Sequence, residues 1–287
     1  MNPGTPAGDG SILYYDADYP SLELGPARAE DVAALARVGM LGDVAFYLEA
    51  AAGLDRVLEV GCGTGRLAIP LARQGAELLG VDVSGPMLDR LRARLAAEPP
   101  EVVRRVRLIE GDAADLDLSA PDPAYPDLAG WRADLVLLPF NLLMLAPDAG
   151  HQRRVLAAAA RHLRPGGRLV LDVMNPLALP LEAERRPSPS QPRVNPETGN
   201  RYVRHAQAAA MDETQVQRLS GWYDELLPDG GIRSTSFAFA WRMVYREELE
   251  RMLAETGFAV EAVSGGFDGT PWTERSSRII VRANTIV

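Results

Sequence analysis

The sequence predicts an α/β fold built on a mostly parallel sheet with helices on both faces. Short apolar runs of strand type alternate with helical segments from Val57 to about residue 176, and parallel strands need such crossover helices between them. The length of 287 residues, 47% of them hydrophobic and 24% charged, is typical of a globular chain with one large domain or two modest ones. The alternation stops near Pro176, so an antiparallel β insert should follow it.

Each predicted element follows from a local pattern, because short apolar runs indicate buried strands and apolar residues at intervals of three and four indicate helices. The predicted strands span residues 57–60, 78–82, 106–109, 133–139, 168–173, 258–263 and 278–282. The predicted helices span residues 67–74, 87–97, 151–163 and 246–255, and residues 27–51 also carry apolar residues at helical spacing. Residues 1–12 are rich in Gly, Pro and Ser, and we expect them to be frayed.

The insert is predicted by a change of period. Residues 183–200 are polar and proline-rich, which is typical of a loop. Residues 202–244 alternate between two faces and contain the strong turn signal Pro228-Asp229-Gly230-Gly231. This pattern indicates an antiparallel hairpin, whose aromatic residues line an apolar cavity or form the insert's own core. These residues are Trp222, Tyr223, Phe237, Phe239 and Trp241.

Charge and composition argue against several classes of protein. The net charge of -9 disfavours nucleic acid and anionic membranes as partners, because both attract a basic surface. The chain has no apolar run long enough for a membrane span and no signal-peptide pattern at its start, so we expect a cytoplasmic protein. A single cysteine excludes an internal disulfide and a Cys-rich metal site, and no His/Asp/Glu cluster suggests a metal, so we expect none.

The strongest motif is the glycine loop Gly61-Cys62-Gly63-Thr64-Gly65 at a predicted strand-to-helix junction. Closely spaced glycines let the backbone turn sharply and approach a ligand. Asp82 ends the next strand, 21 residues beyond Gly61, where a carboxylate can accept hydrogen bonds from both hydroxyls of a ribose. The loop departs from the G-x-G-x-x-G pattern of nicotinamide dehydrogenases, because Arg66 stands where the third glycine belongs. A Walker loop is excluded because the chain contains no lysine.

Five motifs in order resemble those of class I S-adenosylmethionine-dependent methyltransferases. They are V-L-E-V-G-C-G-T-G-R from Val57, D-V-S-G-P-M-L from Asp82, Gly111-Asp112-Ala113, the run from Leu135 to Asn141, and Leu163 to Leu169. The resemblance covers about residues 45–176 and returns at 246–283. It implies a Rossmann-like fold with a mostly parallel seven-stranded sheet and an antiparallel β lid. The layout is similar to that of bacterial amino-sugar N-methyltransferases and glycine N-methyltransferase-like enzymes.

The resemblance implies S-adenosylmethionine as the cofactor, with S-adenosylhomocysteine as the product, and a set of cofactor-binding residues. These are Tyr15, Glu59, Gly61, Cys62, Gly63, Gly65, Asp82, Val83, Met87, Gly111, Asp112, Ala113, Pro139 and Phe140. The catalytic candidates are Tyr14, Asn141 and His205, the last because an imidazole is a base near neutral pH. His151 and His162 flank a predicted helix, and we expect both to face solvent.

The expected organisation has three parts. Residues 1–26 form a partly flexible segment that caps the cofactor, residues 27–182 and 245–287 form the cofactor-binding domain, and residues 183–244 form the lid. The expected activity is methyl transfer to an N or O atom of a small metabolite, as in bacterial secondary metabolism, by a monomer or homodimer. Two alternatives stay open: a regulatory or inactive protein that keeps the cofactor pocket, and a protein or RNA methyltransferase.

Overall fold

The computed structural model describes residues 5–25, 28–121 and 123–286. It confirms the predicted α/β class. The main sheet has seven strands in the order β11-β12-β5-β4-β1-β2-β3, and only β12 runs antiparallel to its neighbours. The strands are β1 (Arg56–Val60), β2 (Glu77–Asp82), β3 (Val106–Glu110), β4 (Ala133–Leu138), β5 (Leu163–Met174), β11 (Phe258–Ser264) and β12 (Arg278–Thr285).

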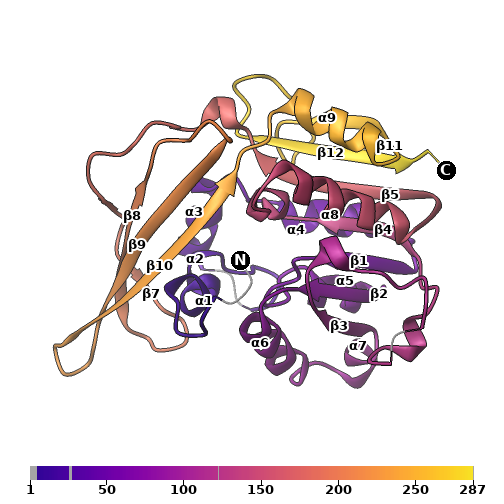
Figure 1. Ribbon diagram of the computed structural model, residues 1–287. Coiled ribbons are helices and arrows are strands. Elements are labelled where there is room, and N and C mark those ends of the chain that lie inside the picture. The colour runs from indigo at the N-terminus through magenta and orange to yellow at the C-terminus, as the bar shows by residue number, and fades with distance from the viewer. Residues whose placement is uncertain (1–4, 26–27, 122, 287) are drawn as a thin grey trace.

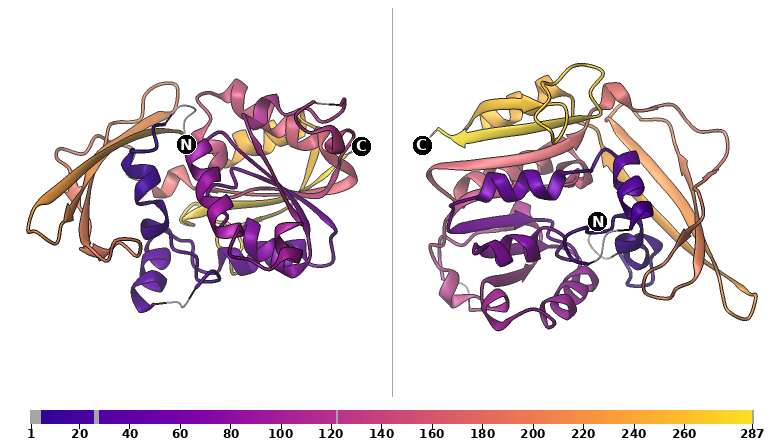
Figure 2. Two further views of the ribbon diagram at one scale, coloured as in Figure 1. Left: turned by 90° about the horizontal axis from the view of Figure 1, so that it is seen from below. Right: turned by 180° about the vertical axis from the view of Figure 1, so that it is seen from behind.

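Helices cover both faces of this sheet, as expected for parallel strands. Helices α4 (Asp43–Ala51), α5 (Ala68–Gln74) and α6 (Gly85–Leu95) pack on one face, and α8 (Ala149–Arg161) and α9 (Arg246–Glu255) pack on the other (Figure 2). Successive strand residues point to opposite faces, so Leu135 and Leu137 join one core cluster and Val136 and Leu138 join the other. The short helical segments are α7 (Pro100–Val103), η1 (Ala113–Asp115), η2 (Pro126–Leu128), η3 (Leu142–Leu145) and η4 (Pro176–Ala178).

The helical pattern over residues 27–51 becomes two helices, α3 (Ala29–Arg37) and α4, instead of one. Gly39 and Gly42 between them have φ angles of +66° and +85°. Glycine adopts this left-handed conformation without strain, and it ends a helix. The apolar spacing therefore predicted both helical segments but not the turn that separates them.

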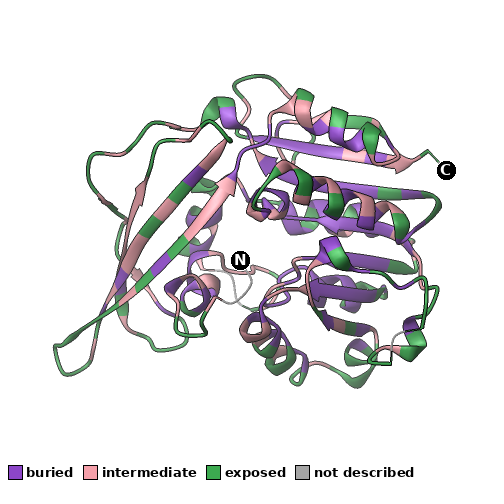
Figure 3. Ribbon diagram, in the orientation of Figure 1, coloured by how far each residue is buried: buried purple, intermediate pink, exposed green. Residues whose placement is uncertain are grey.

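The insert forms a second, antiparallel sheet in the order β10-β9-β8-β6, with β7 also paired to β8. Its strands are β6 (Ser188–Pro189), β7 (Arg193–Val194), β8 (Arg201–Ala208), β9 (Val216–Leu226) and β10 (Ile232–Arg242). The second sheet stands opposite the carboxyl ends of the parallel strands, with the N-terminal helices between the two (Figure 1). Its long strands mix buried, intermediate and exposed residues, whereas the central parallel strands β1, β2 and β4 are buried almost throughout (Figure 3).

The second sheet rejoins the main domain slightly earlier than predicted. Met243 and Val244 are fully buried in the core beside α8 and α9. Arg242 is buried too, and its guanidinium pairs with Glu248 of α9 at 2.6 Å. The return point therefore lies at about Arg242, and a deletion that extends to residue 244 removes part of the main core.

The N-terminal residues are more ordered than the glycine and proline content suggests. Helix α1 (Gly10–Leu13) is followed by α2 (Tyr15–Asp18), and Ile12 of α1 is only 2% exposed. The prediction of fraying is therefore wrong for residues 10–12, because α1 packs against β10 of the second sheet. Residues 1–4, which were included in that prediction, lie outside the described residues.

Candidate active site

The glycine loop joins β1 to α5 in the predicted strand-loop-helix arrangement. Gly61, Gly63 and Gly65 have φ angles of +75°, +51° and +87°, a conformation that favours glycine. A β-carbon on Gly61 would collide with Leu142, and one on Gly65 would collide with Leu91. The loop therefore needs glycine at these positions both for its backbone and for its packing.

Asp82 fixes this loop from the end of β2. Its Oδ2 accepts a hydrogen bond from the Gly63 amide at 2.8 Å, and its Oδ1 accepts one from the Ser84 amide at 2.9 Å. Each carboxylate oxygen can accept a further hydrogen bond. Asp82 is thus held in place while it keeps acceptor capacity toward the space in front of the strands.

Glu59 lies beneath the loop as a buried carboxyl group. It is 2% exposed, and within the described parts of the chain its Oε2 atom has no hydrogen-bond partner. Burial, together with the nearby charge of Asp82, raises the pKa of Glu59 to about 8, although Arg66 partly opposes this shift. An unpaired buried carboxyl at a cavity wall is a site that a ligand cation can complete.

Two adjoining cavities lie at the carboxyl ends of the strands, where open α/β sheets bind ligands. The first, which we call the aromatic cavity, has a volume of about 130 Å³ and lies between the glycine loop, α2 and the second sheet. The second, the strand-end cavity, has a volume of about 450 Å³ and is lined by the ends of β2 and β3 and by parts of β9 and β10. Gly61, Asp82 and Leu142 line both, so one elongated ligand can extend through the two.

A strained turn forms one wall of the aromatic cavity. Phe140 and Asn141 follow β4 with φ angles of +52° and +59°, which are unusual for residues other than glycine. Such strain persists only where the surroundings hold it, and it is concentrated at functional sites. Tyr15 of α2 and Tyr19, which directly follows α2, pack against the Phe140 ring, with ring centroids 6.3 and 4.7 Å from it.

A buried ion pair holds this turn. Asp172 of β5 accepts a hydrogen bond from the Phe140 amide at 2.7 Å and further hydrogen bonds from Tyr47 and Arg278. Arg278, which is 1% exposed, also donates to Oδ1 of Asn141 at 2.9 Å. Burial and the Asp172 carboxylate keep the pKa of Tyr47 well above its usual value, so its hydroxyl stays a donor.

The cavities gather most of the predicted cofactor residues. The aromatic cavity is lined by Tyr15, Glu59, Gly61, Cys62, Gly63, Asp82, Met87, Pro139 and Phe140, and the strand-end cavity adds Val83, Gly111, Asp112 and Ala113. Gly65 lines neither, and its tight contact with Leu91 indicates a packing role. Asn141 also lines the aromatic cavity, although its Oδ1 already accepts from Met174 and Arg278.

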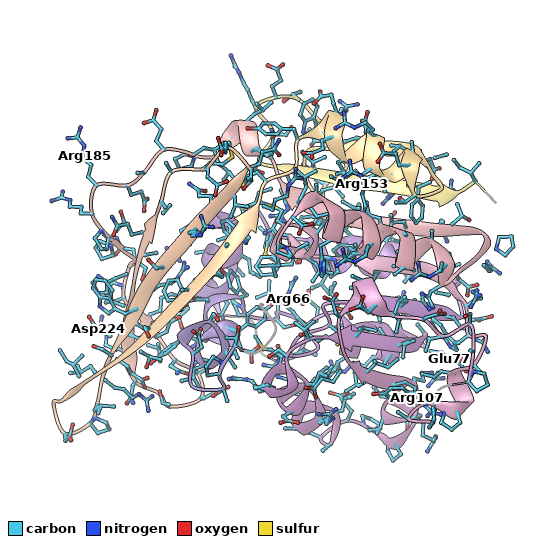
Figure 4. All side chains as sticks on the ribbon, viewed as in Figure 1. Arg66, Glu77, Arg107, Arg153, Arg185 and Asp224 are labelled. Atoms are coloured by element: carbon cyan, nitrogen blue, oxygen red, sulfur yellow. The ribbon has the colours of Figure 1, made fainter. Side chains whose placement is uncertain are left out.

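The structure places the other two catalytic candidates away from both cavities. Tyr14 is buried against Tyr223, with stacked rings 4.2 Å apart, and its hydroxyl donates to Glu225 at 2.5 Å. Alternation along β8 puts His205 on the outer face of the second sheet, where it stacks on Trp222 and lies 3.3 Å from Asp224. Figure 4 shows Asp224 on this sheet and Arg66 in the interior between the sheets. We therefore assign structural roles to Tyr14 and His205.

The two helix-flanking histidines depart from expectation in different ways. His162 is 1% exposed, so its predicted exposure is wrong. Its Nε2 accepts from the Leu118 amide at 3.1 Å and its Nδ1 lies 2.7 Å from the Ala158 carbonyl, and burial lowers its pKa. His151 is only partly exposed, lines the strand-end cavity, and lies 3.2 Å from Asp112.

The sequence did not indicate that four further residues line the two cavities. Arg66, noted only as a missing glycine, is buried and forms a bidentate pair with Asp43. Tyr19 and Arg204 line the aromatic cavity, and Arg218 lines the strand-end cavity. The period-two pattern gave the faces of β9, but the register that places Arg204 opposite Tyr223 is set by strand pairing and is not visible in the sequence.

Comparison with known proteins identifies the family. A model described as a methyltransferase domain matches residues 58–169. The chain is 29% identical to the cypemycin N-terminal methyltransferase of a Streptomyces species over 78% of this chain and 81% of that protein. It is 30% identical to the 27-O-demethylrifamycin SV methyltransferase of Amycolatopsis mediterranei over 72% of this chain and 68% of that protein. The chain belongs to the class I S-adenosylmethionine-dependent methyltransferases.

Solved methyltransferase structures agree with this assignment. The CcbJ methyltransferase of Streptomyces caelestis superposes with a TM-score of 0.71 at 27% identity, covering 99% of both chains. CalS10 of Micromonospora echinaspora, an amino pentose methyltransferase solved with bound S-adenosylmethionine, superposes with a TM-score of 0.65 at 25% identity over 94% of this chain and 96% of that one. None of the helices in the described parts of the methyltransferase is long and apolar enough to span a membrane.

The methyltransferase uses S-adenosylmethionine as its methyl donor, and the described residues fit this cofactor. The unpaired Oε2 of buried Glu59 suits a cationic group. Asp82 offers acceptors for ribose hydroxyls, and Asp112, which lines the strand-end cavity, offers an acceptor for a polar group of the base. We propose that these three carboxylates, with the glycine loop, hold the cofactor.

The pKa of Glu59 leads to a prediction about stability. Because its pKa in the folded protein is raised to about 8 from 4.5, the protonated form stabilises the fold at low pH and this contribution is lost as pH rises from about 4.5 through 8. Glu59→Gln removes the cost of ionisation. We expect the free energy of unfolding of the cofactor-free variant to exceed that of the wild type by on the order of 5 kcal/mol well above pH 8. The two proteins should be equally stable near pH 4.

The same variant should bind S-adenosylmethionine more weakly, since it lacks the negative charge. Chemical unfolding across pH, followed by calorimetric titration of the cofactor at pH 8, measures both effects. A Glu59→Gln protein that loses stability at every pH would show instead that the carboxylate is satisfied in the folded chain.

Proposed function

We propose that this methyltransferase transfers the methyl group to the amine nitrogen of a small molecule, of the kind found in bacterial secondary metabolism. The observation that supports this most is the chemistry of the aromatic cavity. It is small and walled by Tyr15, Tyr19 and Phe140 on one side and by Phe237 and Trp241 on the other. A compact, largely apolar acceptor site of this type suits a metabolite better than a polymer.

The titratable groups of this cavity favour nitrogen over oxygen. A hydroxyl acceptor needs a general base, whereas a neutral amine attacks with its own lone pair. The described residues that line the aromatic cavity include no histidine, and its carboxyl groups, Glu59 and Asp82, lie in the cofactor half. Burial raises the pKa values of Tyr15 and Tyr19, so both hydroxyls keep their protons. The aromatic faces stabilise the positive charge of a methylated ammonium product.

In this proposal the protein contributes position and exclusion of water. The bound cofactor supplies an electrophilic methyl group. The Phe140–Asn141 turn, held by Asp172, fixes the wall against which the acceptor packs. The second sheet covers the acceptor with Tyr223 and Phe239, so the nucleophile is aligned in a dry site without a dedicated base. This assigns a lid function to the segment predicted as residues 183–244.

Paired substrates test the choice of nitrogen. We expect aminodeoxy sugars and amino acid amides to accept a labelled methyl group, and the matched hydroxyl analogues to react at least about 100-fold more slowly, because a general base contributes about 10²–10⁴-fold. Comparable rates on the hydroxyl compounds would favour O-methylation, the reaction named for the rifamycin relative. Label in ribosomal RNA or in protein instead of small molecules would favour a polymer substrate.

The assembly and the location of the enzyme stay predictions. We propose a monomer or a homodimer that has no nucleic-acid partner and is located in the cytoplasm. The acidic balance of 39 Asp and Glu against 30 Lys and Arg supports the absence of a nucleic-acid partner. Light scattering of the purified protein, with and without cofactor, measures the oligomeric state.

A further inference from the structure

Arg204 is a cation on the acceptor side of the site. It lies on β8, opposite Tyr223, and both residues line the aromatic cavity. Its guanidinium lies 4.7 Å from the centroid of the Phe237 ring, and its side chain is only 25% exposed. The second sheet therefore presents a largely buried positive charge to the space where the methyl acceptor binds.

The Nε atom of this guanidinium has an unused hydrogen-bond donor among the described residues. This atom is buried, and no residue that the structure describes accepts from it. The nearest carboxylate oxygen, Oδ2 of Asp18, lies 3.9 Å away, which is too far for a hydrogen bond. A buried donor without a partner costs free energy, and a bound anion that accepts from it removes this cost.

Asp18 is already occupied by other groups. Its Oδ1 accepts from Tyr202 at 2.8 Å and from Arg193 at 3.2 Å, and its Oδ2 accepts from Tyr223 at 2.7 Å. Two arginines thus share one carboxylate, which leaves one positive charge in excess. Arg66, the other arginine of this cavity, is different, because Asp43 neutralises it with two hydrogen bonds.

We propose that Arg204 forms an oxyanion-binding subsite, so that the amine acceptor also carries a carboxylate or phosphate group. The planar fork of a guanidinium matches the paired oxygens of these groups and binds them bidentately. The ring of Phe237, whose centroid lies 4.7 Å from the guanidinium carbon, packs against one side of the fork. This inference rests on the proposed function, because it describes the molecule whose nitrogen is methylated.

Small anions test the subsite directly. The full-length protein, saturated with S-adenosylhomocysteine, is titrated with acetate, inorganic phosphate and the neutral analogue acetamide, and binding is followed by calorimetry. We expect saturable binding of at least one anion, and the preferred one identifies the group. Arg204→Met should weaken that binding roughly 10- to 100-fold. Arg201→Met, an exposed position on the same strand, is the matched control and should leave it unchanged.

Three results would overturn the proposal: no saturable binding of either anion, equal binding of acetamide, or equal anion binding by the wild type and Arg204→Met. The midpoint of thermal unfolding distinguishes an anion-binding role of Arg204 from a purely structural one. Removing an unsatisfied buried cation should leave the midpoint of the ligand-free protein unchanged or raise it, whereas a fall would indicate that Arg204 serves Asp18 as a structural partner.

Measuring methyl transfer to paired acceptors distinguishes a failure of this inference from a failure of the proposed function. 4-Aminobutyrate and 4-aminobutanamide are compared as acceptors of a labelled methyl group. Faster transfer to the carboxylate compound in the wild type, with the preference lost in Arg204→Met, supports both statements. Equal transfer to the two amines, or transfer to neither of them, contradicts the oxyanion subsite. Transfer to hydroxyl compounds alone would contradict the choice of nitrogen, while the anion titration would still report on Arg204.

Discussion

Asp82→Ala is expected to weaken S-adenosylmethionine binding by on the order of 3–6 kcal/mol, because it removes the two charge-assisted hydrogen bonds, worth about 1.5–3 kcal/mol each, that we propose it accepts from the ribose. The carboxylate lines both cavities and is oriented by the amides of Gly63 and Ser84. Its loss removes the acceptors for the ribose and also the group that holds the loop. Isothermal titration calorimetry measures the change.

Asp89→Ala is the control for this variant. Asp89 lies on α6, its side chain is 74% exposed, and it pairs only with Arg92 among the described residues. We expect its cofactor affinity to equal that of the wild type. Unchanged affinity in Asp82→Ala would contradict the role of this carboxylate in cofactor binding.

Asp172→Asn is expected to have the largest effect on stability, a loss of about 3–5 kcal/mol, because breaking a buried ion pair leaves an uncompensated charge. Arg278 would keep its charge in a site where it is 1% exposed. The Phe140 amide and the Tyr47 hydroxyl would lose the carboxylate that accepts from them. Urea unfolding measures the free energy, and kcat should fall as well, since the Phe140–Asn141 turn loosens.

Asp127→Asn provides the comparison at the surface. Asp127 pairs with Arg107 at 2.7 Å, and both side chains are more than half exposed, so its removal should change stability by less than about 1 kcal/mol. If Asp172→Asn were equally mild, the buried pair would not be what holds the turn.

The cofactor half of the site could be read from the sequence because it is local. The glycine loop follows directly from β1, Asp82 ends β2, and Asp112 lies just after β3, and the apolar runs of these strands are visible in the sequence. The carboxyl ends of parallel strands meet at one edge, so the motifs converge without knowledge of tertiary contacts. The predicted sheet is confirmed because its strands are likewise visible as local apolar runs. The predicted antiparallel insert is also confirmed.

The acceptor half could not be read because it depends on pairings between distant segments. Arg204 and His205 are neighbours in sequence, but strand alternation places one in the cavity and the other on the outer face. Tyr14 and Tyr15 diverge similarly, since α2 directs Tyr15 to the cavity while Tyr14 binds Glu225, 211 residues away. Which of two neighbouring side chains faces the cavity is set by strand register and by the packing of distant segments, and residue type does not reveal either.

The ion pair behind the Phe140 turn was also beyond sequence reasoning. Asp172 lies in a strand that reads as a continuous buried run, and Arg278 begins another strand. A charged residue in such a run predicts a buried partner. It does not show which of the 30 basic residues supplies the partner.

The central claim is that the methyl group is transferred to nitrogen. It is tested most directly by turnover with S-adenosylmethionine carrying a ¹³C-labelled methyl group, using an acceptor that holds both an amine and a hydroxyl, such as an aminodeoxy sugar. The ¹³C chemical shift of the product distinguishes an N-methyl from an O-methyl group. We predict a single N-methyl signal that is absent with Asp82→Ala. An O-methyl signal alone, or one of intensity comparable to that of the N-methyl signal, would contradict the account.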